Sequence, residues 1–219
     1  MIIPLTLQEQ FLEQYQQLTS GLYEIEELRA IEDHLEAGAS VLDLGAGVGF
    51  TSAAAMLAGA RSVHAVEANK DLIPCIEEFL RTNCAGHQYS IQNAIAAESR
   101  EHHKLFRRTN FLASSIFANG DLPVVEERLD VPSFSVDELL AEGAYSFLIM
   151  DIEGAEIEAL MSSRLNGIQT LVVEVHPHLY SREKINQVVS RLGHDLGLNL
   201  AQIYAYSQIG ETFVFKRAW

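Results

Sequence analysis

The stretch that decides the fold is VLDLGAGVGFTSAAAMLAGA, residues 41–60. An apolar strand here runs into a glycine loop, and a helix of small residues follows the loop and stops at Gly59. Glycines let the backbone turn tightly and let a ligand approach the main chain where any Cβ would collide. The stretch therefore predicts a strand–loop–helix unit for a nucleotide-type ligand, although a tight turn with no ligand would give a similar pattern.

The spacing of the glycines narrows the choice of ligand. Gly45, Gly47 and Gly49 follow the pattern G-x-G-x-G rather than the G-x-G-x-x-G of dinucleotide-binding loops, and Asp43 precedes them. This pattern favours a cationic or zwitterionic ligand over a pyrophosphate. Glu67 ends the second predicted strand, where its carboxylate could accept hydrogen bonds from both hydroxyls of a ribose. Its structural alternative is to cap the helix that follows.

From residue 40 onward, short β-branched runs alternate with helical stretches. Strands are expected at 40–44, 62–67, 88–92, 146–151, 170–175, 200–206 and 212–217, and helices near 49–58, 71–83, 153–163 and 181–192. Such alternation predicts an α/β, Rossmann-like fold with a mostly parallel seven-stranded sheet and helices on both faces. Because a short turn joins the last two runs, the last strand should be antiparallel.

Two regions depart from this alternation. Residues 1–38 predict a helical extension of two amphipathic helices, whose acidic side chains we expect on a solvated outer face. A substrate lid or the contact of a homodimer is the alternative for this extension. Residues 39–219 form the predicted main domain, and residues 100–135 within it predict an insertion of edge strands and loops.

Composition restricts the partners and the compartment. The chain has 219 residues, 48% of them apolar, and 30 acidic residues against 15 lysines and arginines give a net charge of −15. This excludes a disordered protein, and it argues against nucleic acid and anionic membranes as partners. We expect a cytoplasmic protein, because no apolar run is long enough to span a membrane and the start lacks a secretory signal. Cys75 and Cys84 should be free thiols.

Six segments together resemble a known family: VLDLGAGVGFTS, VEANKDLIPCIEEFLRTN, QNAIA (92–96), FSVDELL (134–140), FLIMDIEGAEIEAL (147–160) and LVVEVHP (171–177). They resemble class I S-adenosylmethionine-dependent methyltransferases, and more narrowly the FkbM family of O-methyltransferases. The resemblance covers about residues 38–177. It implies the class I methyltransferase fold, S-adenosyl-L-methionine as cofactor, S-adenosyl-L-homocysteine as product, and methylation of a hydroxyl on a small molecule or saccharide.

The resemblance also implies which residues bind the cofactor: Asp43, Gly45, Ala46, Gly47, Gly49, Glu67, Ala68, Asn93, Ala94 and Asp151. The glycine loop would hold the methionine moiety and Glu67 the ribose. Asn93 could accept a hydrogen bond from the adenine amino group, and Ala94 could offer its backbone N–H to a ring nitrogen. Where the family most often has a proline shortly after the ribose acid, this chain has Ala68 and Asn69.

The base that removes the acceptor proton should lie at the carboxyl ends of the central strands. Asp151 and His176 end two neighbouring predicted strands and are the candidate bases, with Glu153 beside them. Asp151 and Glu153 have a structural alternative, the capping of the next helix, and His178 is expected to be a loop residue. Asp151, Glu174 and His176 could also converge on a divalent metal. A metal-free enzyme is the default expectation.

The insertion carries REHHKLFRR, residues 100–108, a basic segment in an acidic protein. Arg107, with Ser114 and Ser115 further on, could bind an acceptor that carries a carboxylate or phosphate. The alternative is an exposed edge strand protected by charge.

Two other functions stay open at this point. An NAD-dependent oxidoreductase would share the glycine loop and Glu67. A cofactor-binding module without catalytic activity could use the acidic N-terminal helices to contact a partner.

Overall fold

A computed structural model describes residues 1–4, 16, 19–21, 23–97, 102–108, 125–176, 179–205 and 210–218, with the backbone alone at 102–108 and 125–130. The helices are α3 (Ile25–His34), α4 (Phe50–Leu57), α5 (Ile73–Asn83), α6 (Val136–Ala141), α7 (Glu156–Ser162) and α8 (Arg182–His194), with a short 3₁₀ helix η1 (Lys70–Leu72). The strands are β1 (Ser40–Leu44), β2 (Ser62–Glu67), β3 (Gln88–Asn93), β4 (Ile95–Ala97), β5 (His102–Arg108), β6 (Val125–Ser135), β7 (Phe147–Met150), β8 (Thr170–Val175), β9 (Leu198–Tyr204) and β10 (Glu211–Arg217).

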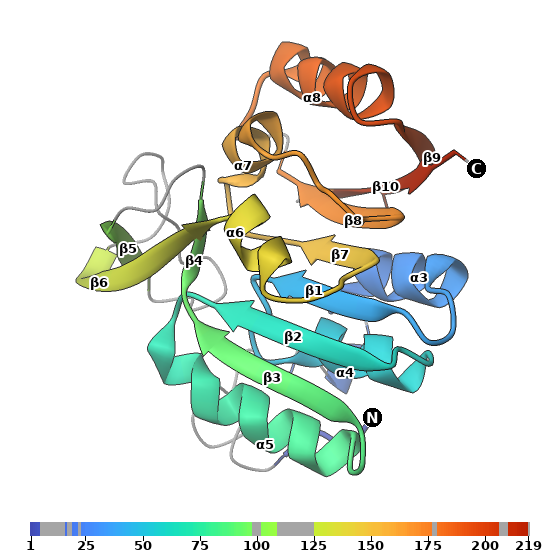
Figure 1. The fold of residues 1–219 in the computed structure, drawn as a ribbon. Coiled ribbons are helices and arrows are strands. Elements are labelled where there is room, and N and C mark those ends of the chain that lie inside the picture. Colours follow the sequence, from blue (N-terminus) through green and yellow to red (C-terminus); the bar gives the residue numbers. More distant parts are fainter. Residues whose placement is uncertain are drawn as a thin grey trace.

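Seven of the strands form one sheet in the order β3-β2-β1-β7-β8-β10-β9 (Figure 1). Strand β10 runs antiparallel to both of its neighbours, and the other pairings are parallel. This confirms the predicted α/β fold with its antiparallel last strand. The chain leaves β1 toward β2 on one side, while β7 pairs with β1 on the other. The glycine loop after β1 therefore lies where the strand order reverses, the usual place for ligands in such sheets.

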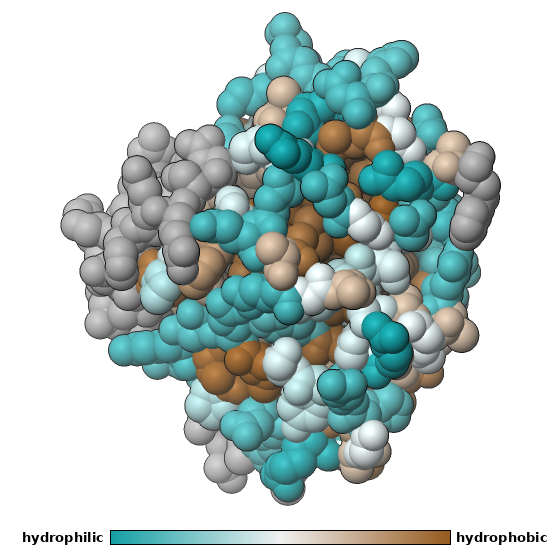
Figure 2. Space-filling model, viewed as in Figure 1, coloured by the Kyte–Doolittle hydropathy of each residue, from teal (hydrophilic) through white to brown (hydrophobic). Residues whose placement is uncertain are grey.

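Helices cover both faces of this sheet because its strands carry apolar side chains on both faces. In β1, Val41 packs in a core cluster with residues of α3, α4 and α5. Leu42 and Leu44 belong to a second cluster, with residues of α6, α7 and α8. Alternate residues of a strand point to opposite faces, so one strand joins both layers. In the view of Figure 2, hydrophilic residues cover most of the surface, including the part over α8.

A second, three-stranded sheet has the order β4-β6-β5. Strand β5 is antiparallel to β6, and β4 is parallel to it. The predicted strands of the 100–135 insertion thus appear as β5 and β6. The segment that joins them, including Ser114 and Ser115, lies outside the described residues.

Helix α3 is the second helix of the predicted N-terminal extension, and most of the first falls outside the described part of the chain. Ala30 and Ile31 of α3 are buried in the core beneath the sheet. The Tyr204 hydroxyl of β9 donates a 2.6 Å hydrogen bond to Asp33, which ties α3 to the far end of the sheet. In the described residues, no helix is long and apolar enough to cross a membrane. Both cysteines are free, as predicted, and both are buried.

The first prediction concerns Gly45, which has a φ of +86° and lies directly against β7. A Cβ at this position would lie 1.6 Å from the carbonyl oxygen of Asp151, so Gly45→Ala forces the loop and strand apart. Gly86→Ala is a matched control, since Gly86 has a φ of +88° with nothing near its Cβ position. We expect the control to lose about 1–2 kcal/mol of unfolding free energy in urea, and Gly45→Ala clearly more. Equal losses would contradict the close packing of loop and strand.

Candidate active site

The glycine loop is attached to the end of β2. The backbone N–H groups of Gly45 and Ala46 both donate to the carbonyl of Val66, at 2.9 and 3.1 Å. Gly45, Gly47 and Gly49 all have positive φ, which only glycine adopts without strain. The loop thus reaches β7 on one side and β2 on the other, at the edge where the parallel strands end.

Asp43 lies beneath this loop and is 1% exposed. Its Oδ2 accepts hydrogen bonds from the hydroxyls of Thr51 and Ser52, at 2.9 and 2.5 Å. Burial raises the pKa of Asp43 to about 6, although both hydroxyls oppose the shift. These contacts hold the first turn of α4 against the end of β1. Asp43 therefore has an internal role in shaping the loop, and its contact with a ligand stays a prediction.

Glu67 links the glycine loop to the segment after β2. Its Oε2 accepts the backbone N–H of Gly47 at 2.9 Å, and its Oε1 accepts that of Asn69 at 2.6 Å. Burial raises the pKa of Glu67 to about 7, while the two backbone hydrogen bonds oppose the shift. Asn69, not Glu67, caps the 3₁₀ helix η1, because its side chain accepts the N–H of Asp71. Each carboxylate oxygen has a second lone pair, which suits it to accept a ribose hydroxyl as well.

Asn93 and Ala94 follow β3 beside Glu67. The Asn93 amide nitrogen donates to the carbonyls of Glu67 and Ala68, both at 2.9 Å, so its oxygen is the atom that suits a ligand. The Ala94 N–H, which we expected to face an adenine nitrogen, donates instead to the Glu67 carbonyl at 3.1 Å. This bond continues the parallel pairing of β2 and β3. Ala68 contributes only its backbone carbonyl here, which accepts one of the two Asn93 hydrogen bonds.

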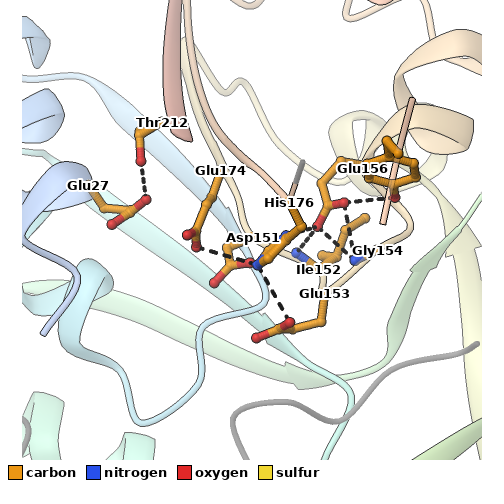
Figure 3. A network of polar contacts seen from close by, with 10 residues as sticks. Glu27, Asp151, Ile152, Glu153, Gly154, Glu156, Glu174, His176 and Thr212 are labelled. Atoms are coloured by element: carbon orange, nitrogen blue, oxygen red, sulfur yellow. Dashed lines mark hydrogen bonds and ion pairs between the residues drawn. The ribbon is translucent and has the colours of Figure 1, made fainter. Parts of the chain in front are cut away.

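His176, at the end of β8, is surrounded by carboxylates from three segments (Figure 3). Its Nε2 lies 3.5 Å from Glu153 Oε2, 3.9 Å from Asp151 Oδ1 and 3.9 Å from Glu174 Oε2. The imidazole side chain is only 4% exposed, whereas Asp151 and Glu153 are 23% and 28% exposed. The structure thus brings together the three predicted catalytic residues, with the two acids nearer the solvent.

The surroundings make His176 a cation. Burial alone would lower its pKa, but the nearby carboxylates of Glu156, Asp151 and Glu153 raise it to about 10. Burial and the charge of Asp151 raise the pKa of Glu174 to about 11, so it is a neutral acid at pH 7. Burial also raises the pKa of Asp151, while the His176 cation and a hydrogen bond with Glu174 oppose this. An imidazolium has no lone pair for a proton, which disfavours His176 as the base.

Glu156 is a functional candidate that sequence analysis missed. Helix α7 begins at Glu156 with Ala155 as its N-cap, three residues later than predicted, because Glu153 and Gly154 have left-handed backbones. The Glu156 side chain is fully buried and reaches back to the N–H groups of Ile152 and Gly154, each at 3.1 Å. The expected capping by Asp151 or Glu153 does not occur, since no side chain caps α7. The acid two residues after the glycine in DIEGAE was the available signal.

Helix α3 adds two more acids to this edge of the sheet. Glu27 is 3% exposed and accepts a hydrogen bond from the Thr212 hydroxyl of β10. Glu24 has a φ of +47° and a buried Oε2 that has no hydrogen-bond partner among the described residues. Burial raises the pKa of both carboxyls, that of Glu27 to about 7. The expectation of a solvated acidic face is therefore wrong for Glu27 and for Glu26, which is 6% exposed. Glu24 directly precedes α3 as its N-cap, and Glu27 lies in the first turn of the helix.

One cation could contact several of these groups. Asp151, Glu153 and His176 have potential ligand atoms that all lie within 4.8 Å of one another, and the imidazole could bind a metal ion only after losing its proton. Glu174, expected in this set, lies at a similar distance from His176. The expectation that the enzyme needs no metal ion stays a prediction.

Some expected residues cannot be placed. Ser114, Ser115, Pro177 and His178 lie outside the described residues. Arg107 lies in β5 opposite Glu127, but its side chain is not described. The acceptor role of the insertion stays a prediction.

Comparison with known proteins agrees with this geometry. The sequence model of the FkbM methyltransferase domain matches residues 43–202, which include the glycine loop, Glu67, Asp151 and His176. Protein arginine N-methyltransferase 7 of Drosophila sechellia is 27% identical over 170 residues, which cover 76% of this chain. The chain spans about a quarter of the length of that relative, since the match covers 24% of it.

Two solved structures share the fold. A methyltransferase FkbM from Methylobacillus flagellatus aligns with a TM-score of 0.57 at 13% identity, covering 90% of this chain and 60% of that one. A ribosomal protein L11 methylase from Lactobacillus delbrueckii subsp. bulgaricus aligns with a TM-score of 0.55 at 14% identity, covering 88% and 77%. At such low identity the two structures support the fold alone.

The second prediction concerns the pH dependence of stability. The folded protein raises the pKa of Glu27 from 4.5 to about 7, so between these pH values it binds a proton that the unfolded chain releases. The unfolding free energy should therefore fall as the pH rises from about 5 to 8. Glu27→Gln should flatten this dependence by roughly 1–3 kcal/mol, measured by urea unfolding across that range. Glu36→Gln, at an exposed position, should leave the slope as it is, and an unchanged slope in Glu27→Gln would contradict the burial of an ionisable group.

Proposed function

Because the chain belongs to the FkbM family of methyltransferases and uses S-adenosylmethionine, we propose that it methylates a hydroxyl group on a small molecule or saccharide. The observation that carries the proposal is the pair of partly exposed carboxylates, Asp151 and Glu153, held beside the buried cation of His176. A hydroxyl acceptor must lose its proton, and a carboxylate at this edge can receive it.

The residues at the sheet edge fit the cofactor in their chemistry. The glycine loop lies at the end of β1, and Glu67, which is bonded to the loop, offers carboxylate oxygens to ribose hydroxyls. Asn93 offers its side-chain oxygen, and the acids around Asp151 suit a positive charge. S-adenosylmethionine supplies a methyl group on a sulfonium sulfur and leaves as S-adenosylhomocysteine. The remaining work of the protein is to align the acceptor and to remove its proton.

Asp151 is the proposed general base. Its side chain is 23% exposed at this edge of the sheet, so an acceptor hydroxyl can reach the carboxylate. Burial raises its pKa above 3.8, which makes it a stronger base than an ordinary aspartate. The His176 cation stabilises the ionised form of Asp151. The hydrogen bond between Asp151 and the neutral carboxyl of Glu174 stabilises it as well. Glu153 is the second carboxylate within reach of the same imidazole.

A guanidinium or amine acceptor is the second candidate. The relative with 27% identity is an arginine N-methyltransferase, and the acids of α3 and β7 would attract a cationic acceptor. Product analysis separates the two, because the methyl group appears on oxygen in one case and on nitrogen in the other. A protein that binds the cofactor but methylates no acceptor would instead be a binding module.

The third prediction tests the base. Purified protein is incubated with S-adenosylmethionine and pools of hydroxylated small molecules and saccharides, and products with one added methyl group are identified by mass spectrometry. Asp151→Asn should lower kcat about 100-fold or more, because a general base contributes a factor of this order. Glu77→Gln, on the exposed side of α5, is the control. Full activity of Asp151→Asn would refute the assignment.

We expect undiminished turnover in EDTA.

The fourth prediction concerns cofactor affinity. Glu67 has a raised pKa of about 7, and the ionised form accepts ribose hydroxyls best. Binding of S-adenosylhomocysteine, measured by calorimetry, should therefore weaken as the pH falls below about 7. Glu67→Gln should weaken it by about 1–3 kcal/mol and remove that pH dependence. Affinity of Glu67→Gln equal to that of the native protein would show that the ribose binds elsewhere.

A further inference from the structure

We propose that Glu156 is a positioning residue for methyl transfer, which fixes the Asp151–Gly154 loop and the His176 imidazole relative to each other. The proposal rests on the proposed function of the same site. Glu156 is fully buried at the start of α7, and the proposed base Asp151 lies five residues before it. Four hydrogen-bonding or charged groups from three parts of the chain converge on this one carboxylate.

The first part is the loop itself. Glu156 Oε1 accepts the N–H groups of Ile152 and Gly154, and Oε2 also accepts that of Gly154, all at 3.1 Å. Between these two N–H groups lies Glu153, a non-glycine residue with a φ of +52°. Such a backbone persists only where its surroundings determine it. Glu156 therefore holds the turn that directs the carboxylates of Asp151 and Glu153 toward the end of β8.

The second part is the imidazole. Nδ1 of His176 lies 3.7 Å from Glu156 Oε1, while Nε2 faces Asp151 and Glu153 on the opposite side of the ring. Figure 3 shows Glu156 on one side of His176 and the other carboxylates on the opposite side. A buried ring with acids on both sides has one stable orientation. It presents its second nitrogen to the carboxylates at the reacting edge.

The third part is Tyr180, just before α8, whose hydroxyl donates to Glu156 Oε2 at 2.9 Å. Burial and the charge of Glu156 raise the pKa of Tyr180, so it is a neutral donor. The carboxylate of Glu156 has a pKa below its usual value: burial opposes ionisation, but His176 and the Gly154 N–H outweigh burial. Glu156 is thus a permanent anion that connects α7, β8 and the start of α8.

Other charged groups also face this arrangement. Glu174 of β8 lies 3.9 Å from Nε2 of His176, and Glu24 and Glu27 of α3 act on Glu174. Glu158 of α7 acts on Tyr180. Within the described residues, Glu156 differs from these acids because it alone combines complete burial with a lowered pKa. Removing its charge should change the protonation of His176 more than removing any of theirs.

The test compares Glu156→Gln, Tyr180→Phe and Glu158→Gln, each in the full chain. Glutamine keeps an oxygen that accepts the loop N–H groups but carries no charge, so the fold should persist. We expect Glu156→Gln to lower kcat about 100-fold with the affinity for S-adenosylhomocysteine within threefold of native, because only alignment is lost. The kcat of Tyr180→Phe should lie between those of Glu156→Gln and the native protein. Glu158→Gln, partly exposed on the same helix, should match the native protein.

A readout without turnover keeps this inference separate from the proposed function. The ¹⁵N shifts of the His176 ring should report an imidazolium at pH 7.5 in the native protein and a neutral ring in Glu156→Gln. A charged ring and native kcat in a folded Glu156→Gln would overturn the proposal. Equal losses of kcat and of S-adenosylhomocysteine affinity would also overturn it, as a general structural role. If the native protein methylates no acceptor, the ring shifts of the native protein and of Glu156→Gln still decide the role of Glu156.

Discussion

The candidate site depends on the placement of one buried positive charge among several negative ones. Four carboxylates lie within 3.9 Å of the His176 imidazole. They come from β8, from the loop after β7 and from the start of α7. Like charges at such distances repel strongly where water is scarce, so without a cation these strands and loops could not end together. The imidazolium removes part of this repulsion, and protonation of Glu174 removes more. Asp43, Glu27 and Glu67 have raised pKa values, because burial outweighs the hydrogen bonds that favour their ionised forms.

This residual charge explains how an acidic protein and a cationic cofactor belong together. The net charge of −15 is not spread evenly over a solvated surface, since Glu24 and Glu27 of α3 turn inward to the same edge as Asp43 and Asp151. A positively charged sulfonium lowers the cost of ionising such groups when it binds. The product carries one positive charge less than the substrate. The same acids would then hold the product less strongly, which favours its release after transfer.

The sequence was sufficient for the sheet and for the glycine loop because both depend on local patterns. Short β-branched runs marked all seven strands of the main sheet, and glycine at three alternate positions marked the loop. The region after β7 was harder to predict. The helical pattern continued across Glu153 and Gly154, because a left-handed backbone leaves no periodic signal in the sequence. The role of Glu156 depends on partners near α8 and β8, which the sequence does not show to be close. The inward turn of Glu27 likewise depends on Thr212, 185 residues away.

The environment, rather than the residue type, separates the tasks of the acids at this edge. Asp43 accepts hydrogen bonds from two hydroxyls of α4 and supports the loop. Glu67 accepts one backbone N–H on each oxygen and keeps a second lone pair on each, whereas Glu156 receives so many donors that it stays ionised. Glu174 is neutral, which leaves Asp151 as a partly exposed carboxylate with a raised pKa. Environments that push apart the pKa values of neighbouring acids are how enzymes assign a base. The proposed base therefore follows from the contacts that exclude its neighbours from the same role.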